Sequence, residues 1–184
     1  MDLGRHRMRY GEPTEITGDQ ERDAFACALQ AIEERKGERY GWDQPPRLWA
    51  LYMSDLSSRM IELFEIPSGE WRDGVLEWAS QYPAPGPVTA TRFADCADGF
   101  VGMAMMHHGR DPRELATLDQ VVIRTITAVD INDLTCVVRR PRGGKRETHA
   151  YAAGQDSMGN ARGHLPRALA RLNHAVRTGA LSLP

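Results

Sequence analysis

The sequence predicts an α+β protein in which an antiparallel sheet of about five strands carries three packed helices. Three observations lead to this fold class: residues 121–140 read as a β-hairpin, three other segments place apolar residues at helical spacing, and the predicted strands show little α/β alternation. Consecutive strands tend to pair with each other. The predicted order is therefore helix, strand, strand, helix, strand, strand, strand, helix.

Length and composition indicate one domain. With 184 residues, of which 41% are apolar, the chain can bury one ordinary core. We expect this domain to cover residues 17–184 and to follow a flexible arm over residues 1–16, which shows no periodicity. No apolar run reaches the roughly 18 residues of a transmembrane helix, so we expect a cytoplasmic protein without membrane contacts. The three dispersed cysteines predict buried or incidental thiols.

Residues 17–36 predict the first helix. An acidic first turn with capping-box spacing suits its start, and an apolar stripe runs over residues 25–32. Residues 33–36 are predicted to form the solvated face, and either Gly37 or Gly41 to end the helix.

Two strands are predicted next, at residues 47–53 and 59–66. A pair of prolines makes the connector before them rigid. The second segment could instead form a short helix, but Pro67 leaves it only about eight residues, which favours a strand.

A second helix is predicted to begin at Ser68 as its N-cap, with an apolar stripe that includes Trp71, Val75, Trp78 and Tyr82. Two tryptophans on one stripe usually belong to a core. Trp71 and Trp78 could also form an aromatic contact surface for a partner, and in that case they should be exposed.

The best-defined strands are those of the hairpin. Residues 99–107 predict the strand before it, with Gly102 marking a bulge or close packing. In the hairpin, residues 121–129 and 134–140 alternate β-branched side chains so that both faces should be at least partly covered. Asn132 and Asp133 are the expected turn residues, since both types tolerate left-handed backbone angles.

The C-terminal part predicts an edge segment and a last helix. Residues 148–153 suit an edge strand, and Pro166 fits the first turn of a helix whose leucines share one face.

Charge is divided unevenly along the chain. Residues 1–120 carry 13 basic and 21 acidic side chains, a net charge of −8, whereas residues 121–184 carry 10 basic and 4 acidic ones, a net charge of +6. Attraction within the fold or between subunits would explain this asymmetry, and so would an anionic partner. For nucleic acid, the predicted contacts are a basic loop and the cationic stripe of the last helix, namely Arg139, Arg140, Arg142, Lys145, Arg146, Arg167, Arg171 and Arg177.

One candidate catalytic site can be identified in the sequence. The candidates are the strand end at His107 and His108, together with Asp111 and Asp119, which would suit a metal-dependent hydrolase. Adjacent strand residues point to opposite faces, so the two histidines cannot bind one metal unless the strand ends between them. No P-loop, nucleophile elbow or zinc-protease motif is found in the sequence. We therefore expect no metal and no cofactor.

Two resemblances bear on the class of protein. The order of the elements is similar to that of roadblock or profilin-like modules, which are mostly scaffolds and binding domains. The segments GWDQPPRLW, GFVGMAMMHHGRD and VVIRTITAVDINDLTCVVRRPRG together resemble a family of small proteins from actinobacteria and their phages, for which the resemblance implies no activity. All but two of the 23 basic residues are arginine, as a high-GC genome would produce.

These observations favour a non-enzymatic protein-interaction or scaffold module of a high-GC bacterium or its phage. Its expected partner is a second copy of the chain, in a homodimer, or another protein. An accessory protein that binds nucleic acid through the basic residues is the first alternative, and a hydrolase at His107 and His108 is the second.

Overall fold

A computed structural model describes residues 6–8, 18–55, 60–86, 99–110, 121–151 and 164–183. Within these ranges the chain forms an α+β fold with three helices, as predicted. The sheet has two strands more than the expected five, because the N-terminal arm and the predicted edge segment each supply one. In chain order the elements are β1 (His6–Met8), α1 (Gly18–Tyr40), β2 (Arg47–Asp55), β3 (Met60–Ile66), α2 (Val75–Ser80), β4 (Phe100–Arg110), β5 (Val122–Asp130), β6 (Thr135–Pro141), β7 (Glu147–Tyr151) and α3 (His164–Arg177).

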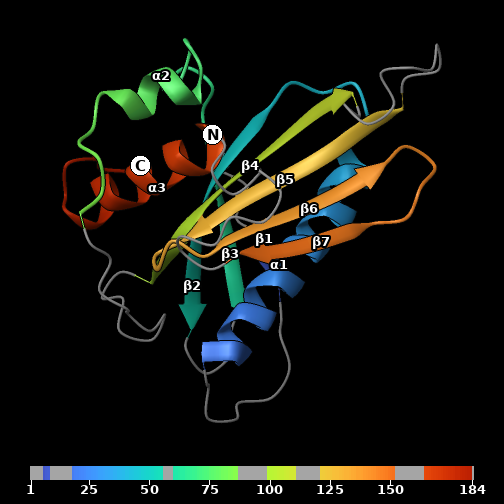
Figure 1. Cartoon of the computed structure of the whole chain (residues 1–184), viewed down its shortest axis with the longest axis horizontal. Coiled ribbons are helices and arrows are strands. Elements are labelled where there is room, and N and C mark those ends of the chain that lie inside the picture. Colours follow the sequence, from blue (N-terminus) through green and yellow to red (C-terminus); the bar gives the residue numbers. More distant parts are fainter. Residues whose placement is uncertain are drawn as a thin grey trace.

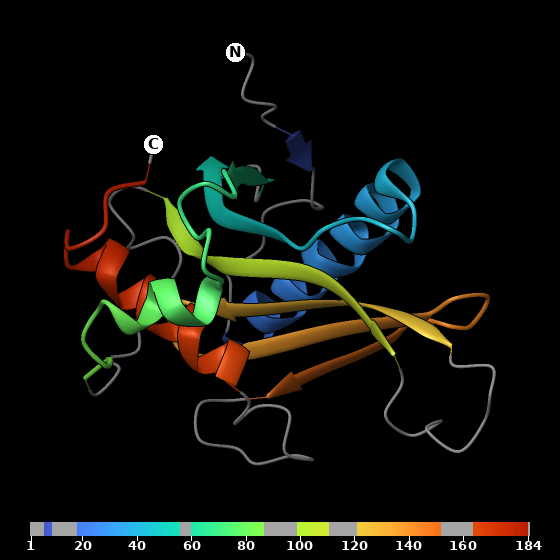
Figure 2. The same cartoon turned by 90° about the horizontal axis from the view of Figure 1, so that it is seen from above.

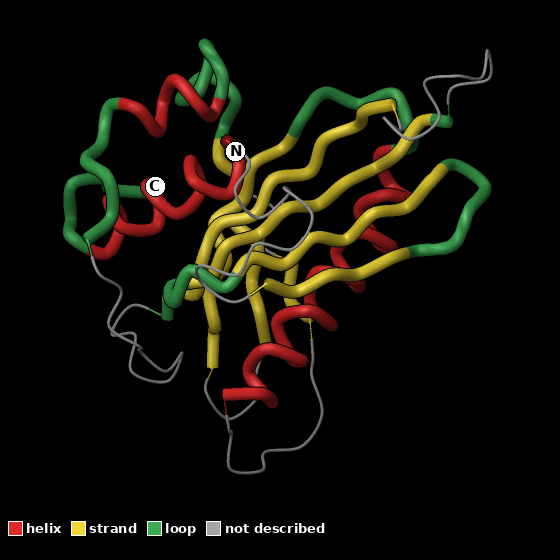
Figure 3. Tube along the Cα trace, in the orientation of Figure 1, coloured by secondary structure: helices red, strands yellow, loops and turns green. Residues whose placement is uncertain are grey.

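The described strands form a single sheet in the order β1-β3-β2-β4-β5-β6-β7, and every neighbouring pair is antiparallel. From β4 to β7 the sheet is a meander in which each strand pairs with the next one along the chain (Figure 1; Figure 3). The predicted pairing of consecutive strands is thereby confirmed. Within the described residues, β7 lies at one edge of the sheet and β1 at the other.

The helices lie on both sides of the sheet. Helix α1 contacts β5, β6 and β7, whereas α3 contacts β4 and β5 and packs beside α2. Viewed from above, α1 and the pair formed by α2 and α3 are well separated, with the strands running between them (Figure 2). No helix in the described ranges is long and apolar enough to cross a membrane.

The predicted stripe of α1 is confirmed, because Phe25, Leu29 and Ile32 are fully buried in the core. The helix ends at Tyr40 because Gly41 adopts a φ of 74° and its N–H bonds to the Gly37 carbonyl at 3.0 Å. Of the two predicted stop residues, Gly41 is therefore the one that ends the helix.

The hairpin of β5 and β6 is also confirmed, and both of its faces are largely buried. Its turn is one residue longer than Asn132-Asp133, because Asp130 bonds through its N–H to the Leu134 carbonyl at 3.0 Å. Asp133 takes the left-handed conformation, with a φ of 60°. The buried Asp130 carboxylate accepts the N–H groups of Asn132 at 2.8 Å and Leu134 at 2.7 Å.

Helix α3 docks on this turn through polar groups. The buried Asn173 amide donates to the carbonyls of Val129 at 2.9 Å and Asp130 at 3.0 Å, and Arg177 donates to the Ile131 carbonyl at 2.9 Å. These bonds attach α3 to backbone carbonyls at the turn of the hairpin.

Two predicted boundaries were wrong. Helix α2 is short and starts at Val75 after Gly74, whose φ is 101°, so Ser68 lies in a turn rather than at an N-cap. Strand β4 continues to Arg110 instead of ending at His107, because it pairs with β5 along its whole second half.

We expect Asp130→Ala to lower the free energy of unfolding by about 2–4 kcal/mol, since it leaves two N–H groups at the turn without their acceptor. Asp130→Asn keeps one side-chain oxygen and should lose less than half as much. Urea denaturation measures both values. Equal losses for the two variants would show that the carboxylate oxygen does not hold the turn.

Candidate protein-interaction site

His107 and His108, the candidate catalytic residues, lie on opposite faces of the sheet. In the ladder with β5, His107 lies opposite Thr125 and His108 lies opposite Arg124. Because β4 does not end between them, their side chains point to opposite faces. Asp111 and Asp119 lie outside the described residues. The described part of the chain holds no group of three His, Cys, Asp or Glu side chains that could bind a metal ion.

Both ring nitrogens of His108 already have partners. Its Nε2 accepts from Arg124 Nε at 3.4 Å, so the ring proton belongs on Nδ1, which lies 3.3 Å from the Gln44 carbonyl and donates to it. Burial, with the Arg124 charge, lowers the pKa of His108 and favours this neutral form. His108 therefore acts as a structural connector between β4, β5 and the loop after α1.

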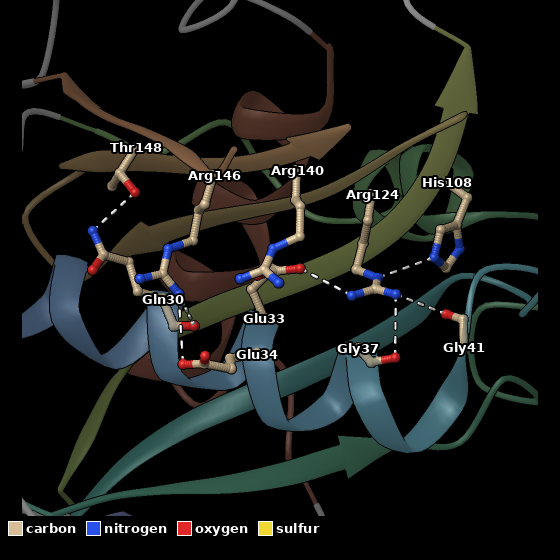
Figure 4. Close-up of polar contacts among 10 residues, drawn as sticks. All are labelled: Gln30, Glu33, Glu34, Gly37, Gly41, His108, Arg124, Arg140, Arg146 and Thr148. Atoms are coloured by element: carbon tan, nitrogen blue, oxygen red, sulfur yellow. Dashed lines mark hydrogen bonds and ion pairs between the residues drawn. The ribbon is translucent and has the colours of Figure 1, made fainter. Parts of the chain in front are cut away.

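Arg124 is the centre of a buried polar network beneath α1 (Figure 4). Its Nη1 donates to Glu33 Oε1 at 2.9 Å, and its Nη2 donates to the carbonyls of Gly37 at 3.2 Å and Gly41 at 3.0 Å. The guanidinium also lies 4.2 Å from the ring centroid of Trp42. The Glu33 side chain is 0% exposed and that of Arg124 is 4% exposed, so both charges are removed from water and depend on these contacts.

Gly37 makes this approach possible. A Cβ on Gly37 would lie 1.6 Å from Arg124 Nη1. A small shift of the Arg124 side chain could not remove this clash, so the guanidinium would have to leave its position. The guanidinium thus occupies the space that any other residue would fill.

Two cations of the predicted basic loop also bind α1. Arg140 Nε forms an ion pair with Glu33 Oε2 at 2.8 Å, but the angles between the two groups are not those of a hydrogen bond. Arg146 Nη1 donates to the Gln30 carbonyl at 3.3 Å and lies 3.7 Å from Glu34 Oε2. Cations of the C-terminal part therefore pair with acids of the N-terminal part, which accounts for part of the charge asymmetry of the sequence.

The remaining predicted nucleic-acid contacts do not gather on one face. Arg142 and Lys145 are exposed in the turn between β6 and β7, whereas Arg167, Arg171 and Arg177 belong to α3. Both views place that turn and α3 toward opposite ends of the sheet (Figures 1 and 2). Arg139 is half-buried on the face of β6 that points away from Arg140.

Trp71 and Trp78 belong to the core, which is the usual meaning of two tryptophans on one stripe, and they do not form the alternative contact surface. Trp71 is 9% exposed and Trp78 is 8% exposed, and the indole N–H of Trp71 donates to the Ile66 carbonyl at 3.3 Å. Neither ring is available as the exposed aromatic surface that a partner would need.

Strand β7 offers a different contact surface. Arg142 N–H bonds to the Val122 carbonyl at 2.9 Å, so even-numbered residues of β6 bond to β5 and odd-numbered ones bond to β7. In β7 the partners of those odd residues are Glu147, His149 and Tyr151. The backbone N–H and C=O groups of Thr148 and Ala150 consequently point away from the sheet at its edge, and Ala150 is exposed.

Helix α1 fixes this edge from one side. Gln30 donates to Thr148 Oγ1 at 2.9 Å, and the Arg146 contacts hold the start of β7 against the same helix turn (Figure 4). The edge is thus supported by side-chain contacts while its outer backbone groups have no strand beside them in the described residues.

Comparisons of the chain with protein-family models, with curated proteins and with solved structures find no match.

The sequence did not reveal the buried network. Glu33 and Lys36 were predicted on the solvated face of α1, yet both are buried. Two signals could have indicated it, namely a single charged residue, Arg124, among the uncharged residues of 121–129, and a glycine, Gly37, inside a helix one turn after Glu33.

We expect Gly37→Ala to lower the free energy of unfolding by about 3–5 kcal/mol, since the new methyl group displaces the buried Arg124 guanidinium from Glu33 and from the two helix-end carbonyls. Gly69→Ala is the matched control, because Gly69 is exposed, has no atom within 4 Å of a Cβ, and lies in a turn. It should change stability by less than about 0.5 kcal/mol in urea denaturation. Similar values for the two variants would contradict the close approach of Arg124.

Burial is the main cause that lowers the pKa of both His107 and His108 below the usual 6.5. As pH falls through 6.5, the unfolded chain binds protons before the folded chain does, so stability should decrease and then level off below the folded-state pKa. Thermal melts from pH 8 to pH 5 should show a smaller decrease for His107→Gln and for His108→Gln than for the wild type. An unchanged pH profile in both variants would show that neither ring is held neutral.

Proposed function

We propose that this protein is a protein-interaction module that binds an extended segment of a partner by adding it as a strand to the β7 edge. The observation that carries this proposal is the outward backbone of Thr148 and Ala150 at the β7 edge of the sheet, where no strand of the described residues lies beside them. Strand addition of this kind supplies affinity through main-chain hydrogen bonds and specificity through alternate side chains.

The arrangement around β7 supports the proposal. An edge strand is a suitable platform only if it stays in place when the partner binds, because ordering it at that moment would reduce affinity. Here β7 is paired along its full length with β6, and α1 holds it through Gln30 and Arg146. The platform is therefore formed in advance.

The two other functions expected from the sequence have less support. His108 engages both ring nitrogens in structural bonds, which leaves no lone pair for a metal or a substrate proton. Arg140 and Arg146 pair with acids of α1, which reduces the charge that the basic loop could offer to phosphates. Hydrolase and nucleic-acid activities are therefore weaker proposals than protein binding.

Ala150→Pro tests the proposed function. Proline removes the outward N–H of residue 150 but no bond to β6, and it suits the φ of an edge strand. Peptides selected from a displayed random library on the immobilised full chain should bind the wild type and Ala150→Val equally.

The same peptides should bind Ala150→Pro at least about tenfold more weakly, as expected for loss of a backbone bond worth about 1 kcal/mol and of close strand contact. Fluorescence anisotropy measures these affinities. Equal binding to the proline and valine variants, or no selected peptide at all, would contradict strand addition at β7.

A further inference from the structure

We infer that the natural occupant of the β7 edge is a second copy of this chain, whose β7 pairs antiparallel with the first around a two-fold axis at His149. This inference rests on the proposed function and names its partner. It joins two sheets into one continuous sheet and makes the interface isologous.

The backbone of β7 is suited to this pairing. An axis at His149 places Thr148 opposite Ala150 of the second copy, and Ala150 opposite its Thr148. These are the residues whose N–H and C=O groups point outward. The pairing therefore completes two reciprocal hydrogen-bonded pairs, and it is the register that aligns all residues of the five-residue strand.

The side chains of β7 are self-complementary in the same register. Glu147 lies opposite Tyr151 of the second copy and diagonal to its His149, so no two carboxylates face each other. Within one chain, His149 Nε2 already lies 3.8 Å from Glu147 Oε2, and its ring stacks on Tyr151 with centroids 6.2 Å apart. The like residues that do meet are the two His149 rings at the axis.

Helix α1 presents small side chains on the same side of the sheet. Because the two-fold axis is perpendicular to the sheet, the α1 helices of both copies lie on one face. Cys27 is exposed on α1, and Ala26 and Ala31 beside it are half-exposed. Small residues at such positions allow two helices to approach without bulky side chains between them.

Cys27 also provides a native probe of the interface. Cys27 belongs to α1, and this helix contacts both β6 and β7, so Cys27 is carried by the helix that covers this part of the sheet. In the paired dimer, β6 of one copy is three strand spacings, or about 14 Å, from β6 of the other. The two Cys27 thiols should therefore lie within the reach of a bismaleimide linker of this length.

The first test is the solution mass of the full chain, measured by light scattering over a dilution series. The wild type and Ala150→Val should have twice the chain mass of 20.6 kDa, and Ala150→Pro should have the mass of one chain. The linker should join two copies of the wild type, but not of Ala150→Pro or Cys27→Ser.

A charge exchange at the axis tests the register without relying on the proline variant. His149→Glu alone should be monomeric, because two carboxylates would face each other beside Glu147. An equal mixture of His149→Glu and His149→Lys should restore the dimer mass.

A monomeric wild type would overturn this inference and leave the proposed peptide binding to be decided by the library selection. A dimer that persists in Ala150→Pro, or a mixture that fails to restore the dimer when the wild type forms one, would place the interface elsewhere and overturn pairing about His149.

Discussion

A carboxylate that is completely buried between two arginines is the constraint on which the arrangement of α1 depends. Removing Glu33 and Arg124 from water costs several kcal/mol for each ion, and only their mutual attraction with additional hydrogen bonds offsets that cost. Arg124 meets this condition through Glu33, two carbonyls at the end of α1, and His108. The network adds little net stability compared with an apolar core, but it strongly penalises any shift of α1 along the sheet.

The energetic cost of shifting α1 also helps to hold strand β7, the candidate interaction edge, in place. Glu33 lies one helix turn after Gln30 and directly before Glu34, so the position that satisfies Arg124 also brings these two side chains to Thr148 and Arg146. Strand β7 is therefore held by the same helix that the buried charges fix in place. A surface for strand addition needs this kind of support, because an edge strand of five residues makes few contacts of its own.

The parts of the fold that were predictable from the sequence are those set by local periodicity. The stripe of Phe25, Leu29 and Ile32 and the alternation of β5 and β6 each follow from burial on a regular helix or strand. The network was not predictable in this way, since Glu33 and Arg124 are 91 residues apart and their pairing depends on tertiary contact. Glu33 stands next to Glu34 and Arg35, so the sequence alone predicts that it is exposed to solvent.

The candidate site illustrates the same division. The presence of an edge segment near residue 148 was predictable, but which backbone groups point outward depends on the register with β6. The short α2 was not predictable from spacing, because the helix begins only after Gly74, whose φ is 101°. The resemblance in element order to roadblock and profilin-like modules stays a prediction about class.

A double-mutant cycle on Glu33 and Arg124 tests most directly whether the buried pair fixes α1. Free energies of unfolding would be measured in urea for Glu33→Leu, Arg124→Met and the double variant. Glu33→Leu leaves Arg124 buried without a carboxylate, and Arg124→Met leaves the buried Glu33 with Arg140 alone. The double variant removes both buried charges, so we expect it to lose at least about 2 kcal/mol less than the two singles together. Additive losses, within about 0.5 kcal/mol, would show that the two charges do not depend on each other and would contradict the account.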